Sequence, residues 1–538
     1  MPYLTRTVPE GHKPRVAVIG AGFAGLRCTD ILIQNGAHVT LFEARDRLGG
    51  RVHQSKVHDH LVDMGPNWIH GTGKNPIVSI AESTNTVVQD FEGNMALIAP
   101  DGKPINDEVA EKISDILWST IAKAFEYSNI YKETIPVDRS LFDYIKEQVE
   151  HTDLSEDEKA LCIESSRMWG AYVGDPIERQ SLKFFCLEEC IDGNNSFVSS
   201  TYKQILEHVS KPARQHADIR LNQPITKIES PPRENTATPT SPQQVTLTTA
   251  SGETSQYDEV VVTCPLGWLK RNKDAFVPAL PPRLTQAIDS ISYGRLEKVY
   301  ITFPRAFWHT DPSPSTSTNN NNNNNNNTYK SYQTPTFAQF LNPTYASTTH
   351  PPSIHWNQEC ISLAAFSDTA NPQTAHPTLL FYTFGPCATH IVTKIAHLAP
   401  TSTEYYQVLH ETFQPFFARL HNYRPDAPEC QPLAYLATQW QNDPFAGHGS
   451  YCNFQVGVHE ADRDIEVLRA GMGAERGVWF AGEHTAPFVA LGTTTGAYWS
   501  GERAAGAICE VYGLGRVGMG VGRDDSLPSA GGVRVGGC

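Results

Sequence analysis

The sequence lacks long apolar runs, basic tracts and regularly spaced cysteines, and each absence excludes a class of protein. No stretch of about 18 consecutive apolar residues occurs, so no membrane-spanning helix is expected. The N-terminal residues contain no apolar core like that of a secretory signal. The final Gly-Gly-Cys matches neither a peroxisomal tripeptide nor a prenylation box. We therefore expect an intracellular, cytoplasmic protein.

Cysteine is scarce and scattered. The chain has 11 cysteines, and the nearest pair, Cys186 and Cys190, is too widely spaced for a Cys-x-x-Cys redox motif. No group of cysteines and histidines has zinc-site spacing, so no metal site is predicted. We expect reduced thiols, as in intracellular proteins. Because the number is odd, at least one thiol must remain unpaired in a monomer.

Positive charge is in deficit. The formal net charge is −15 and the pI is about 5.7, with no basic run along the chain. A general nucleic-acid-binding protein is therefore not expected. Two interpretations of the acidity stay open: an ordinary acidic soluble protein, or attraction of small cationic molecules.

Three segments have low complexity. Ser230–Gln244 is rich in proline, threonine and serine and predicts a loose hairpin loop. Residues 309–336 contain nine consecutive asparagines between polar flanks, which predicts a disordered insertion without a catalytic role. Residues 513–538 are rich in glycine and predict a disordered tail. The rest of the 538 residues suffices for two or more domains with full cores.

The N-terminal part has the pattern of a dinucleotide-binding turn. Val16–Ile19 is a short β-branched run that predicts a buried parallel strand. A helix over Phe23–Asn35 and a second strand over His38–Glu43 follow it. The helix would point its N-terminal N–H groups at phosphates. The turn between strand and helix carries three glycines: Gly20, Gly22 and Gly25.

Each of these glycines has a separate role in the predicted turn. Gly20 allows the tight turn, Gly22 lets the backbone approach a pyrophosphate, and Gly25 lets the helix pack close to the strand. Glu43 ends the second strand, where a carboxylate binds a ribose hydroxyl and disfavours a 2′-phosphate, so NADP is not expected. A chance glycine turn is the alternative, but strand, helix, second strand and acid follow in the right order.

Two further motifs narrow the ligand. Gly49-Gly50-Arg51 after the second strand indicates FAD, and Arg51 has the fork geometry that suits phosphate oxygens. Near the other end of the chain, the strand Val478–Ala481 leads into Gly482-Glu483-His484-Thr485, which is typical of amine-oxidising flavoenzymes. The two ends of the chain are therefore expected to form one site.

Helices and strands alternate between these ends. Apolar periodicity predicts helices over 109–128, 141–149, 154–168, 405–419 and 495–507. It predicts strands over 217–228, 245–249, 257–265 and 295–303. The predicted fold class is α/β: a Rossmann-like FAD-binding domain with an inserted α+β substrate-binding domain. We assign residues 15–80, 205–300 and 475–510 to the first domain, and residues 81–204 and 301–474 to the second.

Together these motifs resemble the flavin-containing amine oxidases, which include polyamine and spermine oxidases, monoamine oxidases and lysine-specific histone demethylases. The resemblance follows block order over roughly residues 15–510, interrupted by the asparagine tract. The blocks that carry it, besides those above, are Asp63–Gly71, Arg220–Ile225, Val260–Lys270, Leu296–Trp308, Trp440–Tyr451 and Gly492–Ala497.

The resemblance implies a bound FAD. No cysteine lies between Thr485 and Gly496, where monoamine oxidases attach the flavin, so FAD is expected to bind noncovalently. The residues that the resemblance assigns to the cofactor are Gly20, Gly22, Gly25, Glu43, Arg45, Gly50, Arg51, Asn67, Trp68, Ile225, Gly482, Glu483, Thr493 and Thr494. For Glu483, a plain acid at a helix N-terminus is the alternative.

The implied reaction moves a hydride from the carbon next to an amine nitrogen to flavin N5. The imine would hydrolyse to an aldehyde and an amine, and dioxygen would reoxidise the flavin to give hydrogen peroxide. Lys298 matches the lysine that binds a water near N5, where a partly buried ammonium can shift its pKa and move protons. The alternative is an ordinary lysine on a strand.

Three more residues are catalytic candidates. Trp440 and Tyr451 would wall the substrate channel with aromatic faces, or else belong to the core. His70 would orient a substrate nitrogen as a partly protonated imidazole, or else be structural. Thr493 stands where some relatives have a second tyrosine, which suits a long threaded substrate better than a monoamine. Glu188 and Glu189 are weak candidates for binding distal nitrogens.

These features favour a polyamine oxidase-like enzyme acting on a small amine with dioxygen as acceptor. An oxidase of another amine or of an L-amino acid is the nearest alternative, although no arginine for a substrate carboxylate is identified. A flavoprotein that binds a small ligand without turnover is the third. Gly447-His448 replaces the arginine that usually precedes Gly-Ser-Tyr. No long helical insertion or extra N-terminal domain is found, so a chromatin demethylase is not expected. The oligomeric state stays open.

Overall fold

The computed structural model describes residues 13–90, 95–233, 244–309, 336–346, 350–351, 354–366 and 375–515. Most of the three low-complexity segments, residues 234–243, 310–335 and 516–538, lie outside these ranges. The loop and disorder predicted for them therefore stay predictions. The described residues form a mixed α/β structure with several sheets, as expected.

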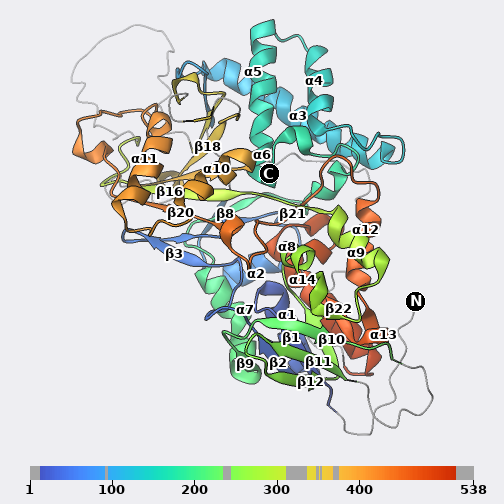
Figure 1. Cartoon of the computed structure of the whole chain (residues 1–538). Helices are drawn as coiled ribbons and strands as arrows, with labels where there is room; N and C mark the ends of the chain where they lie inside the picture. Colours follow the sequence, from blue (N-terminus) through green and yellow to red (C-terminus); the bar gives the residue numbers. More distant parts are fainter. Residues whose placement is uncertain are drawn as a thin grey trace, which may run out of the picture.

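A five-stranded parallel sheet joins strands from the beginning, middle and end of the chain (Figure 1). Its order is β22 (Val478–Phe480), β13 (Glu259–Val262), β1 (Arg15–Ile19), β2 (His38–Phe42) and β9 (Asp218–Arg220). Both faces of β1 and β13 are buried, which explains their continuous β-branched sequences. The predicted strands at 16–19, 38–43 and 478–481 are confirmed.

Helices cover this sheet and end near the glycine turn. Helix α1 (Phe23–Gln34) follows β1 and packs between α7 (Lys203–His216) and α14 (Thr494–Val511). A Cβ at Gly501 of α14 would overlap the carbonyl oxygen of Ala24, so glycine allows the two helices to touch. Gly36 follows the C-cap of α1 with φ +89°, the left-handed conformation that commonly ends a helix.

A four-stranded sheet lies next to the parallel sheet, in the order β12, β11, β10, β14. Its strands are β10 (Ile225–Glu229), β11 (Val245–Thr249), β12 (Thr254–Tyr257) and β14 (Phe276–Val277). The single strand predicted over 217–228 is wrong, because this segment forms β9 and β10 in different sheets. Asn222 has φ +56° and Pro224 follows, so the chain turns between them.

The third large sheet has six strands in the order β20, β16, β19, β18, β17, β7. These are β7 (Met95–Ile98), β16 (Glu297–Thr302), β17 (Phe337–Phe340), β18 (Gln358–Ser362), β19 (Thr378–Thr383) and β20 (Ala434–Ala437). All neighbours are antiparallel except β17 and β7. Helices α10 (Gly385–Ile395) and α11 (Thr403–Phe417) cover one face through an apolar cluster.

A helical layer packs against the other face of the six-stranded sheet, at the top of Figure 1. It contains α3 (Asp107–Tyr131), α4 (Leu141–Glu150) and α5 (Glu156–Ser166). Ser140 and Ser155 cap the last two in capping boxes with Asp143 and Glu158, so the helix predicted from residue 154 begins at Glu156. The helices predicted over 109–128, 141–149 and 405–419 are confirmed.

The remaining elements connect these layers. The helices are α2 (Pro76–Ser83), α6 (Gly170–Val173), α8 (Leu266–Arg271), α9 (Pro282–Ser290), α12 (Ala461–Ala470) and α13 (Gly473–Arg476). The strands are β3 (Gln54–Val57), β4 (His60–Asp63), β5 (Trp68–Ile69), β6 (Val88–Asp90), β8 (Ser196–Val198), β15 (Ser292–Tyr293) and β21 (Cys452–Asn453).

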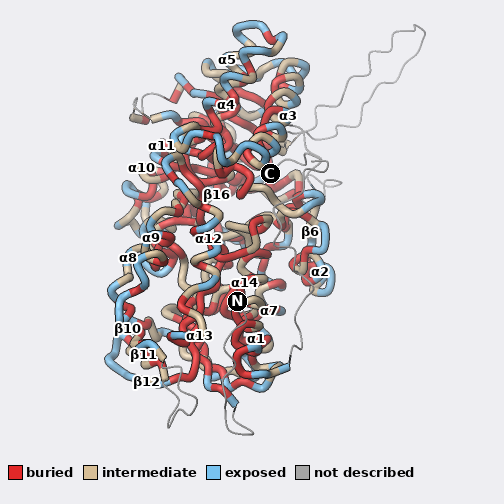
Figure 2. The backbone as a smooth tube through the Cα atoms, turned by 90° about the vertical axis from the view of Figure 1, so that its right-hand side faces the viewer, coloured by how far each residue is buried: buried red, intermediate tan, exposed pale blue. Residues whose placement is uncertain are grey.

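Buried backbone runs from the parallel sheet to the helical layer (Figure 2). Strand β16 begins inside the range predicted for the FAD-binding domain, yet pairs with strands of the range predicted for the substrate-binding domain. The domain boundaries therefore stay predictions. Within the described ranges, no helix is long and apolar enough to cross a membrane, and no group of three or more metal-ligating side chains was found.

Candidate active site

The glycine turn after β1 has no room for a side chain at two of its glycines and has open space at the third. A Cβ at Gly25 would overlap the carbonyl oxygen of Gly20. Gly20 has φ +105°, and a Cβ there would lie 2.7 Å from Oγ1 of Thr263. At Gly22, by contrast, a Cβ would meet nothing within 4 Å. The turn thus leaves a bare backbone surface at the N-terminus of α1, which fits a pyrophosphate.

Glu43 lies against this turn. Its Oε2 accepts the N–H of Ala21 at 2.8 Å and its Oε1 accepts the N–H of Arg45 at 2.9 Å. The carbonyl oxygen of Glu43 also accepts the N–H of Gln223 at 2.9 Å, which brings the start of β10 and Ile225 close by. Glu43, predicted to bind a ribose hydroxyl, therefore lies near Ile225, which the resemblance also assigns to the cofactor.

Arg51 joins the N-terminal and C-terminal motifs. Its Nη1 donates to Oε1 of Glu483 at 3.1 Å and to the carbonyl oxygen of Ser450 at 2.5 Å. Gly50 precedes it with φ +58°, the left-handed conformation that glycine adopts without strain. Burial raises the pKa of Glu483, but the charge of Arg51 and the hydrogen bonds that Glu483 accepts from Arg51 and Cys452 help to outweigh it, and the net pKa is lowered. Glu483 is therefore ionised at neutral pH.

Arg45 and Gly482 also lie at contacts between motifs. Nη2 of Arg45 donates to Oδ2 of Asp443 at 2.8 Å, and its guanidinium lies 5.4 Å from the ring centre of Phe445. Gly482 has φ +144°, and a Cβ there would lie 2.7 Å from the ring of His484. Burial lowers the pKa of His484 to about 4, so this imidazole is neutral. Arg45 and Gly482 therefore both contact residues next to the cofactor motifs, Asp443 and His484 respectively.

The N-terminus of α14 forms a second turn near the site. Oγ1 of Thr493 accepts the N–H of Gly496 at 2.9 Å, which makes Thr493 the N-cap. Thr494 begins the helix, and its hydroxyl lies 3.4 Å from that of Tyr202. Tyr202 also donates to the carbonyl oxygen of Trp68 at 2.6 Å. Tyr202, which no sequence motif singled out, therefore links two predicted cofactor residues.

Lys298 lies in β16 and is 5% exposed. Its ammonium donates to the carbonyl oxygen of Gly65 and to Oδ1 of Asn67. Oδ1 of Asn67 also accepts the hydroxyl of Tyr382 at 2.9 Å, while its Nδ2 donates to the hydroxyl of Tyr300 at 3.3 Å. The side chain of Asn67, predicted to contact FAD, here organises a polar cluster around Lys298.

Asp63 adds a buried acid near this cluster. Burial raises the pKa of Asp63 and lowers the pKa of Lys298, while the charge of each opposes the other's shift. The hydroxyl of Tyr300 donates to the carbonyl oxygen of Asp63 at 2.5 Å. Burial thus favours the neutral form of both the carboxyl and the amine.

Glu297, the neighbour of Lys298, holds Trp440 in place. Its Oε2 accepts the backbone N–H of Trp440 at 3.0 Å, and its Oε1 accepts that of Gln441 at 2.9 Å. The indole Nε1 of Trp440 donates to the carbonyl oxygen of Met64 at 3.3 Å. Glu297 is 1% exposed, and burial raises its pKa to about 7. Glu297 was not singled out from the sequence, although its place next to Lys298 in the same motif could have indicated it.

Tyr451 and His70 are placed by the loops around β5 and β21. The hydroxyl of Tyr451 donates to the carbonyl oxygen of Tyr172, and a Cβ at Gly492 would lie 3.4 Å from its ring. Burial lowers the pKa of His70, and the side chain of Asn195 only partly opposes this. The partly protonated imidazole predicted for His70 is therefore disfavoured. Its Nδ1 is buried and accepts or donates no hydrogen bond among the described residues.

A family model described as flavin containing amine oxidoreductase matches residues 23–509 of the chain. The chain belongs to this family. The resemblance deduced from the motifs is thereby confirmed, and so is FAD as the cofactor that the family implies. The described turn, with open space at Gly22 beside Glu43, fits that cofactor.

Curated relatives of this amine oxidoreductase include polyamine oxidases and a histone demethylase homolog. Probable polyamine oxidase 4 of Arabidopsis thaliana is 26% identical over 466 residues, covering 83% of this chain and 78% of the relative. Polyamine oxidase 3 of Oryza sativa subsp. japonica is 26% identical over 512 residues, covering 92% and 89%. Lysine-specific histone demethylase 1 homolog 3 of Oryza sativa subsp. indica is 25% identical over 512 residues, covering 93% and 54%.

The segment after His70 contacts the backbone of residues 191–192, which follow Glu188 and Glu189 in the chain. A Cβ at Gly71 would overlap the carbonyl oxygen of Ile191, and Gly73 donates its N–H to the carbonyl oxygen of Asp192 at 2.8 Å. The residues leading into this stretch are Glu188 and Glu189. Burial raises the pKa of Glu188 to about 7 and also raises the pKa of Glu189. The two acids are therefore close in the chain to the segment that contacts Gly71.

Proposed function

We propose that this FAD-dependent amine oxidoreductase is a polyamine oxidase-like enzyme that uses dioxygen as its acceptor. The observation that carries the proposal is the buried amine of Lys298, which donates to Gly65 and Asn67 in the block Asp63–Gly71 of the family resemblance. Relatives named polyamine oxidases support the choice of a polyamine substrate.

Bound FAD supplies the acceptor for the hydride that leaves the carbon next to the amine nitrogen. The chain's own residues prepare that step. Burial favours the neutral amine of Lys298, which can take a proton from a water or return one to it. Trp440 and Tyr451 present aromatic faces to the amine of the substrate and keep bulk water away from it. Glu297 keeps Trp440 in position through its backbone N–H.

We assign the proposed cofactor residues to successive parts of the FAD molecule. The turn with Gly20, Gly22 and Gly25 would hold the pyrophosphate, assisted by Gly50 and Arg51. Glu43 and Ile225 would hold ribose and adenine. Glu483 would bind the ribityl–diphosphate region, where Gly482 permits close approach, and Thr494 would offer its backbone N–H to the pyrimidine carbonyl. The other proposed cofactor residues are Arg45, Asn67, Trp68 and Thr493. Because no cysteine lies between Thr485 and Gly496, we propose that the flavin is bound noncovalently.

Anaerobic flavin bleaching tests the proposal. The purified protein would be mixed with spermine, spermidine, N-acetylated polyamines, simple monoamines, L-amino acids and a methylated histone peptide. Bleaching by one polyamine class, followed by recovery of colour and release of hydrogen peroxide when air is admitted, is the expected result. Bleaching by monoamines, amino acids or the peptide alone would overturn the polyamine assignment. A yellow protein that no amine bleaches would favour a flavoprotein that only binds ligands.

A further inference from the structure

A row of polar side chains crosses the six-stranded sheet, starting at Lys298. The strand register places Lys298 opposite Tyr382, Tyr382 opposite Glu359, and Glu359 opposite Gln339. Directly opposed residues point to the same face of a sheet. All four are buried. The row therefore begins at the candidate catalytic amine and continues across the strands away from it.

The surroundings of this row are apolar. Leu380, Ile361 and Phe337 lie two positions from row members on the same strands, so they share their face and belong to one apolar cluster. Buried polar groups cost free energy unless they are hydrogen-bonded. A row of this kind in an apolar face is consequently a candidate for binding a polar ligand.

Glu359 is the one acid of the row, and only one of its two carboxylate oxygens accepts hydrogen bonds from the described residues. Its Oε2 accepts Nε2 of Gln339 at 2.9 Å and the hydroxyl of Tyr172 at 3.4 Å. Its Oε1 is buried and has no hydrogen-bond partner among the described residues. The side chain is 0% exposed, and burial raises its pKa to about 7. A cation placed against Oε1 would remove this energetic cost.

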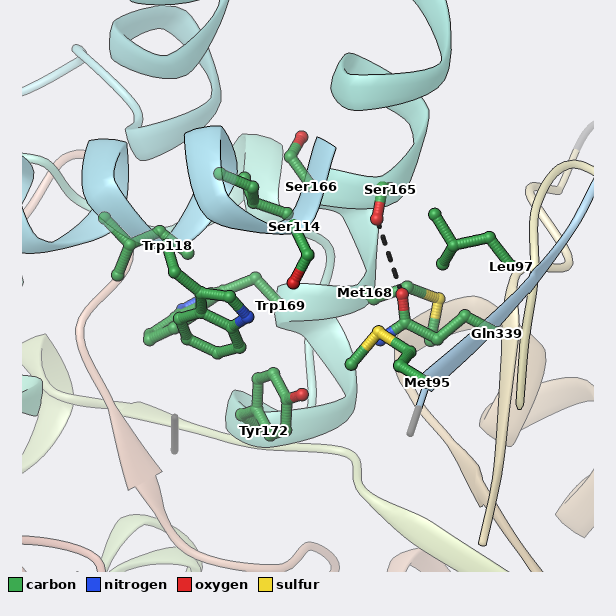
Figure 3. Close-up of a pocket in the computed structure, with 12 residues that line it drawn as sticks. Met95, Leu97, Ser114, Trp118, Ser165, Ser166, Met168, Trp169, Tyr172 and Gln339 are labelled. Atoms are coloured by element: carbon green, nitrogen blue, oxygen red, sulfur yellow. Dashed lines mark hydrogen bonds between the residues drawn. The ribbon is translucent and has the colours of Figure 1, made fainter. Parts of the chain in front are cut away.

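A cavity adjoins the partners of Glu359. It is small, is partly open to solvent, and lies between the helical layer and the sheet edge formed by β7 and β17. Figure 3 shows Trp118, Trp169 and Tyr172 on one side and Gln339 on the other, with Gln339 accepting the hydroxyl of Ser165 at 3.4 Å. Aromatic faces of this kind bind ammonium groups and alkyl chains.

Two contacts connect Glu359 with the candidate active site. The hydroxyl of Tyr172 reaches Glu359, while its carbonyl oxygen accepts the hydroxyl of Tyr451. Tyr382, opposite Glu359, donates to the same Asn67 oxygen that accepts the amine of Lys298. Two strand spacings separate Lys298 from Glu359, which corresponds to about 10 Å. This is within the reach of an extended diamine.

We propose that Glu359 binds the distal ammonium group of the substrate, so that the enzyme selects diamines and polyamines over monoamines. The inference rests on the proposed function, because it takes Lys298 to mark the oxidised end. The aromatic cavity next to Gln339 and Tyr172 receives the distal part of the chain. Oε1 of Glu359 accepts a hydrogen bond from the ammonium, and the alkyl chain follows the polar row.

The test compares an α,ω-diamine with a monoamine of equal length on the FAD-loaded enzyme. Calorimetric titration would use α,ω-diaminooctane and octylamine with the wild type, Glu359→Gln and Glu164→Gln. Removing the charge of Glu359 while keeping its shape should weaken diamine binding by about 10-fold or more and leave monoamine binding unchanged. Glu164 contacts Arg167 and Asn357 in the same region, so its variant serves as the matched control and should keep the diamine preference.

A wild type without diamine preference, or a Glu359→Gln enzyme that retains it, would overturn the inference. If the Glu359→Gln enzyme fails to bind flavin, the inference is tested on the wild type alone. Its affinity for α,ω-diamines should pass through a maximum as the chain is lengthened, and a steady rise parallel to that of monoamines would overturn the inference. Diamine preference that depends on Glu359, without bleaching of the flavin, would refute the proposed oxidation but support the binding site.

Discussion

The glycine turn and the six-stranded sheet contribute to the candidate active site in opposite ways. At the turn, Gly22 leaves open space and Gly25 admits a carbonyl oxygen, so absent side chains shape the site. In the sheet, Lys298, Tyr382 and Glu359 shape it with buried polar groups held by hydrogen bonds. The turn thus offers a rigid backbone surface, whereas the sheet offers groups whose charge depends on their surroundings.

Substituting the glycines of the turn should have the largest effect and separate folding from binding. Gly25→Ala would force a Cβ into the carbonyl oxygen of Gly20, and we expect a loss of about 3 kcal/mol or more in the free energy of unfolding. Gly22→Ala has room in the protein, so stability should change by less than about 1 kcal/mol while FAD affinity falls at least about 10-fold.

Urea unfolding and bound-flavin absorbance measure the two effects. Equal losses of stability in both glycine variants would contradict the view that Gly22 faces the ligand and Gly25 faces the protein.

Lys298→Met should lower the rate of turnover by about 100-fold while keeping flavin bound, because it removes the amine that exchanges protons at the sheet. Stopped-flow bleaching and reoxidation of the flavin would show which half-reaction slows. Lys270→Met is the control: burial lowers the pKa of Lys270 to about 8, but its amine donates to the carbonyl oxygens of Ile288 and Asp289. A Lys298→Met enzyme with wild-type rates would remove Lys298 from the mechanism.

The buried acid of the sheet should be visible in the pH dependence of stability. The pKa of Glu359 is raised to about 7 in the folded protein, above its ordinary value of 4.5. The folded state therefore holds this proton longer, and its contribution to the free energy of unfolding falls as pH rises from about 4.5 to 7, by up to roughly 1.4 kcal/mol per pH unit. Urea unfolding of Glu359→Gln should show a flatter profile in this window. An unchanged profile would mean that Glu359 ionises normally.

The smallest expected effect compares two helix caps. Thr493→Ala and Ser155→Ala each remove a side chain that accepts a backbone N–H, which should cost about 1 kcal/mol in stability. Only Thr493 caps the helix of the proposed flavin site, so only its variant should also lower FAD affinity, as measured by fluorescence titration. Equal flavin affinities in both variants would place the cap of α14 outside the cofactor site.

Local patterns were sufficient for some elements and misleading for others. The β-branched run at Val16–Ile19 identified β1 because burial on both faces leaves a continuous apolar sequence. The segment over 217–228 was wrongly predicted as one strand, because strand-like residues continue on both sides of the turn at Asn222. His70 was found by its motif, but its pKa could not be foreseen since burial by the surrounding loops determines it.

The sequence by itself determined the family and the nucleotide-binding turn, because both depend on short motifs in which each constraint acts among residues close together in the chain. Only the tertiary structure decided that Lys298, Tyr382, Glu359 and Gln339 form one row. They come from four strands, and hydrogen-bond register between the strands sets which side chains face one another. The same register leaves an oxygen of Glu359 buried without a hydrogen-bond partner in the part of the chain that the structure describes, which no local pattern encodes.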